Sequence, residues 1–262
     1  MSKSTGIHEH FKPEEAPFVD RVLDWMERVE QQHMTKETDF LDPRQIQIVQ
    51  SLANRFPSVQ VLTWGGYADA ERQRMLLAPD YAYLTEEDVH ITLLSVTSSD
   101  TKFADLQHGD FLGAILGLGM KRDKMGDLHI HEQGCHYIVA EETASFLDTH
   151  LRQVHRVQVF TEVLPITQLI TSEEKVEELT ISVASLRLDG VMSDAVRMSR
   201  AKILPWIKSG KCKVNWKVEE NPSILLQPGD MLSLKGYGRF KLLDISGPTK
   251  SGRHRVTLGK YV

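Results

Sequence analysis

The chain has 262 residues, 41% hydrophobic and 26% charged, with a formal net charge of −5, which is the composition of a soluble globular protein with room for one large domain or two to three small ones. No run of about 18 apolar residues occurs, which excludes a membrane-spanning helix, and residues 1–15 lack the apolar core of a secretory signal. The two cysteines, Cys135 and Cys212, lie far apart, so we expect free thiols in a cytoplasmic protein.

Residues 1–80 are expected to form a mainly helical region with one short strand. Apolar residues recur at three- and four-residue spacing and predict a helix over residues 14–35. A second helix is predicted to begin at Pro43, which suits the first helical position, with Asp42 as its N-cap. Residues 58–79 are interpreted as a strand, a glycine turn and a variable loop.

Residues 81–164 alternate regularly between predicted strands and helices. Their order is β-α-β-β-α-β, which predicts the ferredoxin-like arrangement that RNA-recognition-motif (RRM-like) domains also use. The predicted elements cover residues 89–96, 108–119, 126–131, 135–140, 141–154 and 156–164. The RNA-recognition signature is absent and only Tyr137 offers a ring on the expected strand, so the fold is expected without a base-stacking surface. Residues 165–182 carry an acidic run and are interpreted as a linker that leads into a strand.

A group of histidines and a cysteine in this middle region is a candidate metal site. His129 and His131 share one face of a predicted strand, and Cys135 and His136 return across a tight turn. Four such ligands suit zinc, but their spacing fits no established zinc pattern. We therefore interpret them as exposed or core residues and predict neither a metal nor a cofactor.

A short basic run follows the first helix of the middle region. It contains Lys121, Arg122 and Lys124. We weigh two interpretations, a charged loop and a second RNA contact.

Charge is distributed unevenly along the chain. Residues 183–262 contain 15 Lys and Arg against 6 Asp and Glu, a net charge of +9, whereas residues 1–182 contain 16 against 30, a net charge of −14. A basic block on an acidic body is typical of a nucleic-acid-binding module, although a merely basic surface is the alternative.

This basic block is predicted to fold as two short helices followed by a small sheet. The first helix is expected over residues 186–197. The second is expected to be capped by the hydroxyl of Ser199 and to end at Gly210 in a left-handed conformation. Pro205 lies inside the second helix and predicts a kink or an early break. A Pro-Gly-Asp turn then leads into one strand, residues 231–240.

The basic block resembles the RNA-binding domain first seen in the fourth protein of the small ribosomal subunit, here called the S-four domain. The residues that carry the resemblance stand in order and at the right spacing: Arg187-Leu188-Asp189, Ser199-Arg200, Ile207, Gly210, Lys213-Val214-Asn215, Pro222-Ser223 and Gly229-Asp230. With HGDFLGAILGLGMKRDKMGDL ahead of it, most of residues 40–262 resembles the YlmH family of bacterial S-four proteins. The chain departs from the S-four pattern at Pro205 and at Trp216, which stands in place of Gly.

The predicted elements, with the S-four resemblance of the last part, give an α+β protein with a helical N-terminal region, a ferredoxin-like middle domain over residues 81–164, a linker over residues 165–182 and an S-four domain over residues 183–262. The resemblance also implies RNA binding on the ribosome, and relatives point to rescue or quality control of stalled large subunits that carry peptidyl-tRNA. The expected partners are ribosomal RNA, tRNA and the large subunit, with a protein partner for the acidic N-terminal domains and no membrane.

The basic residues around the second helix predict where RNA phosphates bind, because free N–H groups at a helix start favour anions. Asp189 is expected to orient an arginine rather than to contact RNA. The predicted RNA-binding residues are Arg187, Arg197, Ser199, Arg200, Lys202, Lys208, Lys211, Lys213, Asn215 and Lys217.

Trp216 is interpreted from the alternation of the residues around it. A strand that runs on past Asn215 places Lys211, Lys213, Asn215 and Lys217 on one face, and Trp216 on the other face with its apolar neighbours. We therefore predict a core position for Trp216, with RNA stacking as the alternative.

The predicted function is RNA binding in translation without catalysis, so no catalytic residue is predicted. The segments that a tRNA synthetase needs are absent, the glycines of residues 117–119 follow a helix rather than a strand, and Asp189 belongs to the S-four helix. Two alternatives stay open: an RNA-modifying enzyme of pseudouridine synthase or methyltransferase type, and a structural partner in cell division or organelle assembly.

Overall fold

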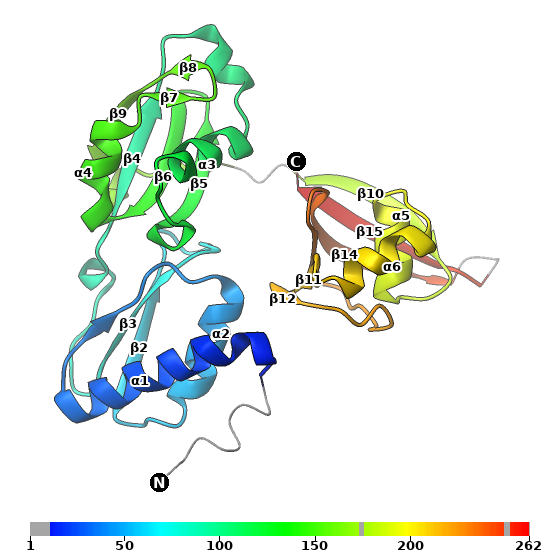
Figure 1. Ribbon diagram of the computed structural model, residues 1–262, viewed down its shortest axis with the longest axis horizontal. Coiled ribbons are helices and arrows are strands. Elements are labelled where there is room, and N and C mark those ends of the chain that lie inside the picture. The colour runs from blue at the N-terminus through cyan, green and yellow to red at the C-terminus, as the bar shows by residue number, and fades with distance from the viewer. Residues whose placement is uncertain (1–10, 173–175, 249–251, 262) are drawn as a thin grey trace. The chain divides into compact units, whose positions relative to one another are not determined.

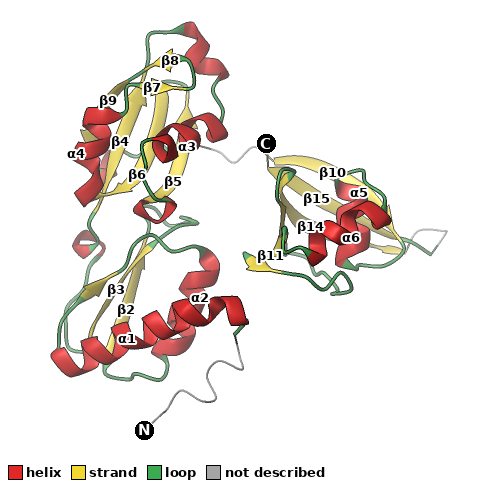
Figure 2. Cartoon of the chain, in the orientation of Figure 1, coloured by secondary structure: helices red, strands yellow, loops and turns green. Residues whose placement is uncertain are grey.

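The computed structural model describes residues 11–172, 176–248 and 252–261 (Figure 1). The chain divides into two compact units, Met1–Ser172 and Glu173–Val262. Both units combine helices with antiparallel strands, which confirms the predicted α+β class (Figure 2). The first ten residues of the expected N-terminal region and three residues of the expected linker, 173–175, lie outside the described residues.

The first part of unit 1 is a three-stranded sheet in the order β1-β3-β2 with two helices packed against it. Its elements are α1 (Ala16–Gln32), β1 (Lys36–Glu37), α2 (Pro43–Ala53), β2 (Val59–Trp64) and β3 (Arg74–Pro79). The predicted cap of α2 is confirmed: the Asp42 carboxylate accepts from the Gln45 amide and the Gln45 side chain accepts from the Asp42 amide, both at 2.9 Å. This reciprocal pair fixes the start of α2 at Pro43.

The interpretation of residues 58–79 as one strand and a loop is wrong in its second half. Residues 74–79 form β3, all six residues are buried, and β3 pairs with β1 on one side and β2 on the other. The apolar run after Arg74 was its signal, and a strand that is buried on both faces shows no alternation to reveal it.

The second part of unit 1 is a four-stranded antiparallel sheet in the order β5-β6-β4-β9. Its elements are β4 (Ile91–Thr97), α3 (His108–Gly117), β5 (Met125–His131), β6 (Gly134–Ala140), α4 (Glu141–His150), β7 (Gln153–Val154), β8 (Val157–Gln158) and β9 (Phe160–Leu164). The predicted single strand over residues 156–164 is wrong, because β8 pairs with β7 and only residues 160–164 join the sheet. Tyr137 is fully buried and donates its hydroxyl to the Phe111 carbonyl at 3.0 Å, so its ring belongs to the core.

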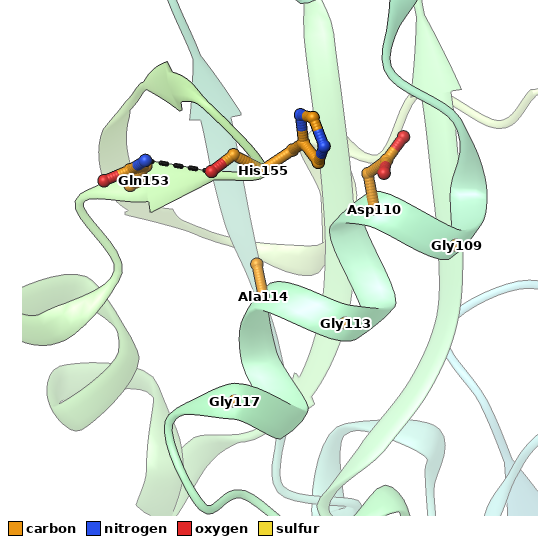
Figure 3. Close-up of a pocket in the computed structure, with 7 residues that line it drawn as sticks. All are labelled: Gly109, Asp110, Gly113, Ala114, Gly117, Gln153 and His155. Atoms are coloured by element: carbon orange, nitrogen blue, oxygen red, sulfur yellow. Dashed lines mark hydrogen bonds between the residues drawn. The ribbon is translucent and has the colours of Figure 1, made fainter.

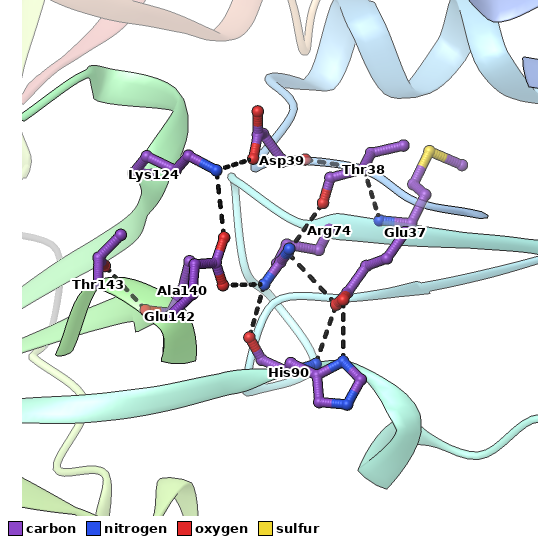
Figure 4. Close-up of polar contacts among 10 residues, drawn as sticks. Glu37, Thr38, Asp39, Arg74, His90, Lys124, Ala140, Glu142 and Thr143 are labelled. Atoms are coloured by element: carbon purple, nitrogen blue, oxygen red, sulfur yellow. Dashed lines mark hydrogen bonds and ion pairs between the residues drawn. The ribbon is translucent and has the colours of Figure 1, made fainter. Parts of the chain in front are cut away.

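A buried arginine joins the two sheets of unit 1 (Figure 4). Arg74 on β3 is 5% exposed, and a buried guanidinium is tolerated only when its donors are satisfied. Its partners are the carbonyl oxygens of Thr38 (2.8 Å) and His90 (2.6 Å) and the carboxylates of Glu37 and Glu142 (3.3 Å each). These partners lie on or beside β1, β4 and α4, so one side chain ties both parts together.

Unit 2 is a six-stranded antiparallel sheet in the order β10-β15-β14-β13-β11-β12, with two helices packed on one face. Its elements are β10 (Val176–Val183), α5 (Leu188–Ala195), α6 (Arg200–Lys208), β11 (Cys212–Val214), β12 (Lys217–Val218), β13 (Met231–Leu234), β14 (Gly238–Pro248) and β15 (His254–Tyr261). The predicted strand over residues 231–240 is a hairpin, because Gly236 and Gly238 adopt positive φ between β13 and β14. Among the described residues, no helix combines the length and the apolar character that crossing a bilayer requires.

Candidate nucleic-acid interface

Arg187, one of the predicted arginines, pairs with Asp189 at the start of α5, and the charge of Arg200 also acts on this carboxylate. Arg187 donates from Nε and Nη2 to the two carboxylate oxygens of Asp189, at 3.1 and 2.9 Å. The Asp189 residue is 5% exposed, and its pKa is lowered chiefly by the hydrogen bond from Arg187 and also by the charge of Arg200. The expectation that Asp189 orients an arginine is confirmed, and a two-pronged ion pair fixes the plane of the guanidinium.

Arg200 reaches α5 through a gap that a glycine leaves open. A Cβ built on Gly190 would lie 2.5 Å from Nη2 of Arg200, so the guanidinium occupies the space beside the glycine. The sequence showed Gly190 only as an unremarked residue inside a predicted helix, and it gave no signal for this contact.

The junction between the helices presents further predicted residues to solvent. Arg197 has φ +55° and follows the last turn of α5, where the Met198 amide donates to the Ser193 carbonyl at 2.8 Å. Ser199 is the N-cap of α6 as predicted, but its hydroxyl makes no capping hydrogen bond. Arg197, Ser199, Arg200 and Lys202 are all exposed.

The second helix continues through Pro205. It runs from Arg200 to Lys208, so the expected early break does not occur. The missing proline amide removes one hydrogen bond from a helix of nine residues, and burial of Ile203 and Ile207 holds the helix against the sheet. Gly210 follows with φ +70°, which confirms the predicted left-handed end.

Lys211, one of the predicted RNA-binding residues, lies over a ring pair that the sequence did not single out. The Lys211 ammonium lies 4.8 Å from the centroid of the Trp206 ring, and the Trp206 and Tyr237 rings meet edge to face at 5.5 Å. Tyr237 is 38% exposed at the tip of the β13–β14 hairpin. The glycine on each side of Tyr237 could have indicated this turn from the sequence. Lys211 itself is exposed, and so are Lys208 and Lys213 on either side of it in the chain.

The strand that was expected to run past Asn215 stops at Val214. Val214 pairs with Lys217, so Asn215 and Trp216 form a two-residue hairpin loop. Both loop residues have positive φ, +50° and +64°, as a type I′ turn requires. Asn tolerates this conformation, whereas the same conformation costs a bulky residue about 1–2 kcal/mol. For this reason Trp216 led us to predict a continuous strand instead of a turn.

The turn overturns the predicted lysine row. Directly paired residues share a face, so Lys217 lies on the face of Val214, while Lys213 shares its face with Val218 and Ser233. Lys211 and Lys213 therefore keep their predicted common face, and Lys217 leaves it.

Asn215 is engaged within unit 2. Its amide nitrogen donates to Asp230 at 2.8 Å, and its side-chain oxygen accepts from the Met231 amide at 2.9 Å. Its backbone amide donates to the Met231 carbonyl at 2.7 Å. These bonds fix the turn in place.

The predicted core position of Trp216 is wrong. Trp216 is partly exposed and belongs neither to the buried core cluster of unit 2 nor to the apolar residues that pack against that cluster. Val214, two residues earlier, does pack against it. The alternation failed because the turn interrupts the strand.

The basic run in unit 1 serves mostly internal contacts. Lys124 donates to Asp39 at 2.6 Å and to Glu142 at 3.1 Å (Figure 4). Arg122 donates to the carbonyl oxygens of the first two residues of β5, at 2.7 and 2.9 Å. Lys121 is exposed and has no partner among the described residues.

The four candidate metal ligands do not converge. Cys135 pairs with Ile130 and lies in the core on the α3 side of the sheet, where burial raises its pKa well above the usual value. His129 and His136 pair with each other on the opposite face. Within the described part of the chain, no group of three potential ligands is placed to hold a metal ion.

The histidine face is covered by the residues after β9. The Ser172 amide donates to Nδ1 of His129 at 3.2 Å, and the Ile170 amide donates to Nδ1 of His136 at 3.1 Å. Burial, followed by the neighbouring histidines, lowers the pKa of His129 to about 4. Both rings are therefore neutral acceptors at pH 7.

A pocket of about 370 Å³ lies along α3 (Figure 3). Asp110 uses its carboxylate to cap α3 by accepting from the Gln107 amide at 2.9 Å, and Gln153 donates to the His155 carbonyl at 2.9 Å. These polar groups serve the local fold and are not arranged for catalysis. The remaining lining includes glycines at four-residue spacing: Gly109, Gly113 and Gly117.

Known proteins match both the parts and the whole of the chain. A family model described as "YlmH, N-terminal" matches residues 14–82, and one described as "Putative RNA-binding domain in YlmH" matches residues 85–168. A curated Bacillus subtilis protein, "Ribosome-associated protein quality control protein P2", is 39% identical over 253 residues, which cover 97% of this chain and 98% of that protein. The solved structure of "Cell division protein ylmH from Streptococcus pneumoniae" is 28% identical with a TM-score of 0.53 and covers 63% of this chain and 99% of its own.

Proposed function

The chain belongs to the YlmH family, and from that premise we propose that it is a ribosome-associated RNA-binding protein whose unit 2 grips RNA phosphates as an S-four domain. The observation that carries this proposal is the two-pronged pair of Arg187 with the buried Asp189 in a basic unit, with the Arg200 guanidinium seated beside Gly190 on the same helix. The buried carboxylate there orients Arg187, and an arginine with a fixed plane suits phosphate.

The RNA is ribosomal RNA or tRNA, and the setting is the rescue or quality control of stalled large subunits that carry peptidyl-tRNA. The name of the Bacillus subtilis relative supports this setting. The family model over residues 85–168 supports an RNA contact from unit 1, and Lys121 is the free cation that we propose for it. The acidic surface of unit 1 is proposed to meet a protein partner, because acidic surfaces are repelled by phosphate.

The proposal is for binding without catalysis. The letters Arg187-Leu188-Asp189 match the aspartate motif of a pseudouridine synthase, but both oxygens of Asp189 accept from Arg187. A carboxylate held in this way orients its partner and is not presented to a substrate.

Binding of the intact protein to ribosomal RNA and tRNA should weaken steeply with salt. With about six phosphate contacts, the affinity falls roughly a thousandfold between about 50 and 200 mM salt. The measurement is a series of binding isotherms at increasing salt, with the double variant Arg187→Ala, Arg200→Ala for comparison. That variant should bind more weakly and show a shallower slope. A flat salt response of the wild-type protein would rule out phosphate-dominated binding.

Sucrose-gradient fractionation of ribosomes tests the setting. Co-migration of the protein with large subunits is the expected result. Migration with free tRNA alone would remove the large subunit from the proposal.

A further inference from the structure

Trp216 is held in a conformation that its own side chain opposes. It is the second residue of the β11–β12 loop and has φ +64°, where glycine is the natural occupant. Strain of this kind persists where the surrounding structure enforces it, and such residues gather at functional sites.

Among the described residues of unit 2, the apolar core does not hold the Trp216 ring in place. The ring lies outside the core cluster and outside the apolar shell around it. Among the described residues, Trp216 makes no paired-ring or cation–ring contact, in contrast to Trp206, which has both. Packing of the Trp216 ring in the core therefore does not explain why its backbone keeps a positive φ.

The loop that carries the ring is rigid and basic. Three hydrogen bonds anchor Asn215 to Asp230 and Met231 on the neighbouring strand. Lys213 and Lys217 flank the loop on the two strands of the hairpin. An aromatic ring on an anchored basic loop is the chemistry that binds an unpaired nucleobase, by stacking on the ring and by contact of the adjoining phosphates with the lysines.

We propose that Trp216 is a stacking platform for an unpaired base of the RNA that unit 2 binds. The inference rests on the proposed RNA binding and adds to it a preference for single-stranded or looped segments, because a paired and stacked base has no free face to offer.

The deciding variant is Trp216→Gly. Glycine adopts positive φ freely, so the variant keeps the turn, relieves the strain and removes the ring. We expect an unfolding temperature equal to or above that of the wild type, and an affinity for a mixed-sequence single-stranded oligoribonucleotide that is lower by about 5- to 150-fold. Affinity for a fully paired RNA duplex of the same length should be unchanged, and so should the salt dependence, because no charge is removed.

The matched control is Trp216→Phe, which keeps both a ring and the strain and should retain most of the single-strand affinity. The inference is overturned if Trp216→Gly binds the single strand as well as the wild type does, if it loses affinity for both RNAs alike, or if it unfolds at a lower temperature. Failure of the proposed function looks different, because the wild-type protein itself then binds neither RNA in a salt-dependent way.

Discussion

Gly190 lies inside α5 where a side chain from the neighbouring helix α6 fills the space that a larger residue would occupy. Arg200, whose backbone belongs to α6, places its guanidinium there, and its charge helps to lower the pKa of Asp189 after the larger effect of Arg187. The position of a proposed phosphate-binding group thus depends on the absence of one methyl group. A residue of this kind has no charge or ring by which sequence reasoning would find it.

Gly190→Ala should separate RNA binding from stability. The new Cβ pushes away the end of a flexible side chain, while alanine favours the helix by up to about 1 kcal/mol, so the free energy of unfolding should change by less than about 1 kcal/mol. Loss of one arginine contact should weaken RNA binding by about 5- to 10-fold or more. Thermal unfolding and RNA isotherms measure the two effects.

Gly113→Ala is the matched control, because a Cβ on that α3 glycine meets no atom within 4 Å. It should leave RNA affinity unchanged. If Gly190→Ala binds as tightly as the wild type, Arg200 does not contribute from this position.

The parts of the helices and strands that could be predicted from the sequence are those that nearby residues determine. The cap at Asp42 and the left-handed residue Gly210 both lie within a few residues of the helix end they fix, and both predictions are confirmed. The site was harder to predict from the sequence. Some of its key contacts join residues of different helices, and some of its residues adopt conformations that their own side chains disfavour. The pair of Arg200 with Gly190 is an example of the first, and Trp216 at positive φ is an example of the second.

The segment from Pro165 to Ser172 shows a tertiary role that its sequence hides. It was interpreted as the start of a linker, yet its amides at 170 and 172 donate to His136 and His129 on the sheet of unit 1. A protonated ring offers no acceptor, so this docking requires neutral histidines.

The stability of unit 1 should therefore fall in mild acid. The pKa of His129 is 6.5 in its ordinary state and about 4 in the fold, lowered first by burial and then by His136, His131 and His108. Between these two pH values the unfolded chain binds a proton at His129 and the folded chain does not, so the free energy of unfolding decreases as the pH falls from 6.5 towards 4, by at most about 3 kcal/mol. Denaturant unfolding at several pH values measures this slope.

His129→Asn keeps a side-chain acceptor for the Ser172 amide and removes the titration, so it should flatten the slope. His150→Asn, at an exposed position on α4, should leave the slope as it is. An unchanged slope in His129→Asn would show that another group causes the acid sensitivity.

The two units of the chain carry net charges of opposite sign. Residues 1–172 contain 15 Lys and Arg against 26 Asp and Glu, a net charge of −11, and residues 173–262 contain 16 against 10, a net charge of +6. The charge change nearly coincides with the boundary between the compact units. RNA attraction is therefore concentrated in unit 2, and any contact from unit 1 must come from a few exposed cations on an acidic surface.

Lys121→Glu tests whether unit 1 adds such a contact. Arg122 and Lys124 are left intact, because their hydrogen bonds hold β5 and the two sheets in place. We expect ribosome co-sedimentation to fall several-fold at moderate salt, since one exposed phosphate contact is lost and a repulsion is added. Lys102→Glu, another exposed lysine of unit 1, is the control. Equal co-sedimentation of both variants would assign ribosome binding to unit 2 alone.

The pairing of β10 with β15 sets the order in which the protein can assemble during synthesis. Val176 pairs with Tyr261 and Val183 with His254, so the first strand of unit 2 waits for a partner made more than seventy residues later. The described strand pairings of unit 1 are all made by residues that precede 165. A nascent chain can therefore complete unit 1 on the ribosome that makes it, whereas the sheet that supports α5 and α6 closes only after residue 261 has left the exit tunnel. The basic face of unit 2 is therefore completed after unit 1, once β15 is free to pair with β10 and β14.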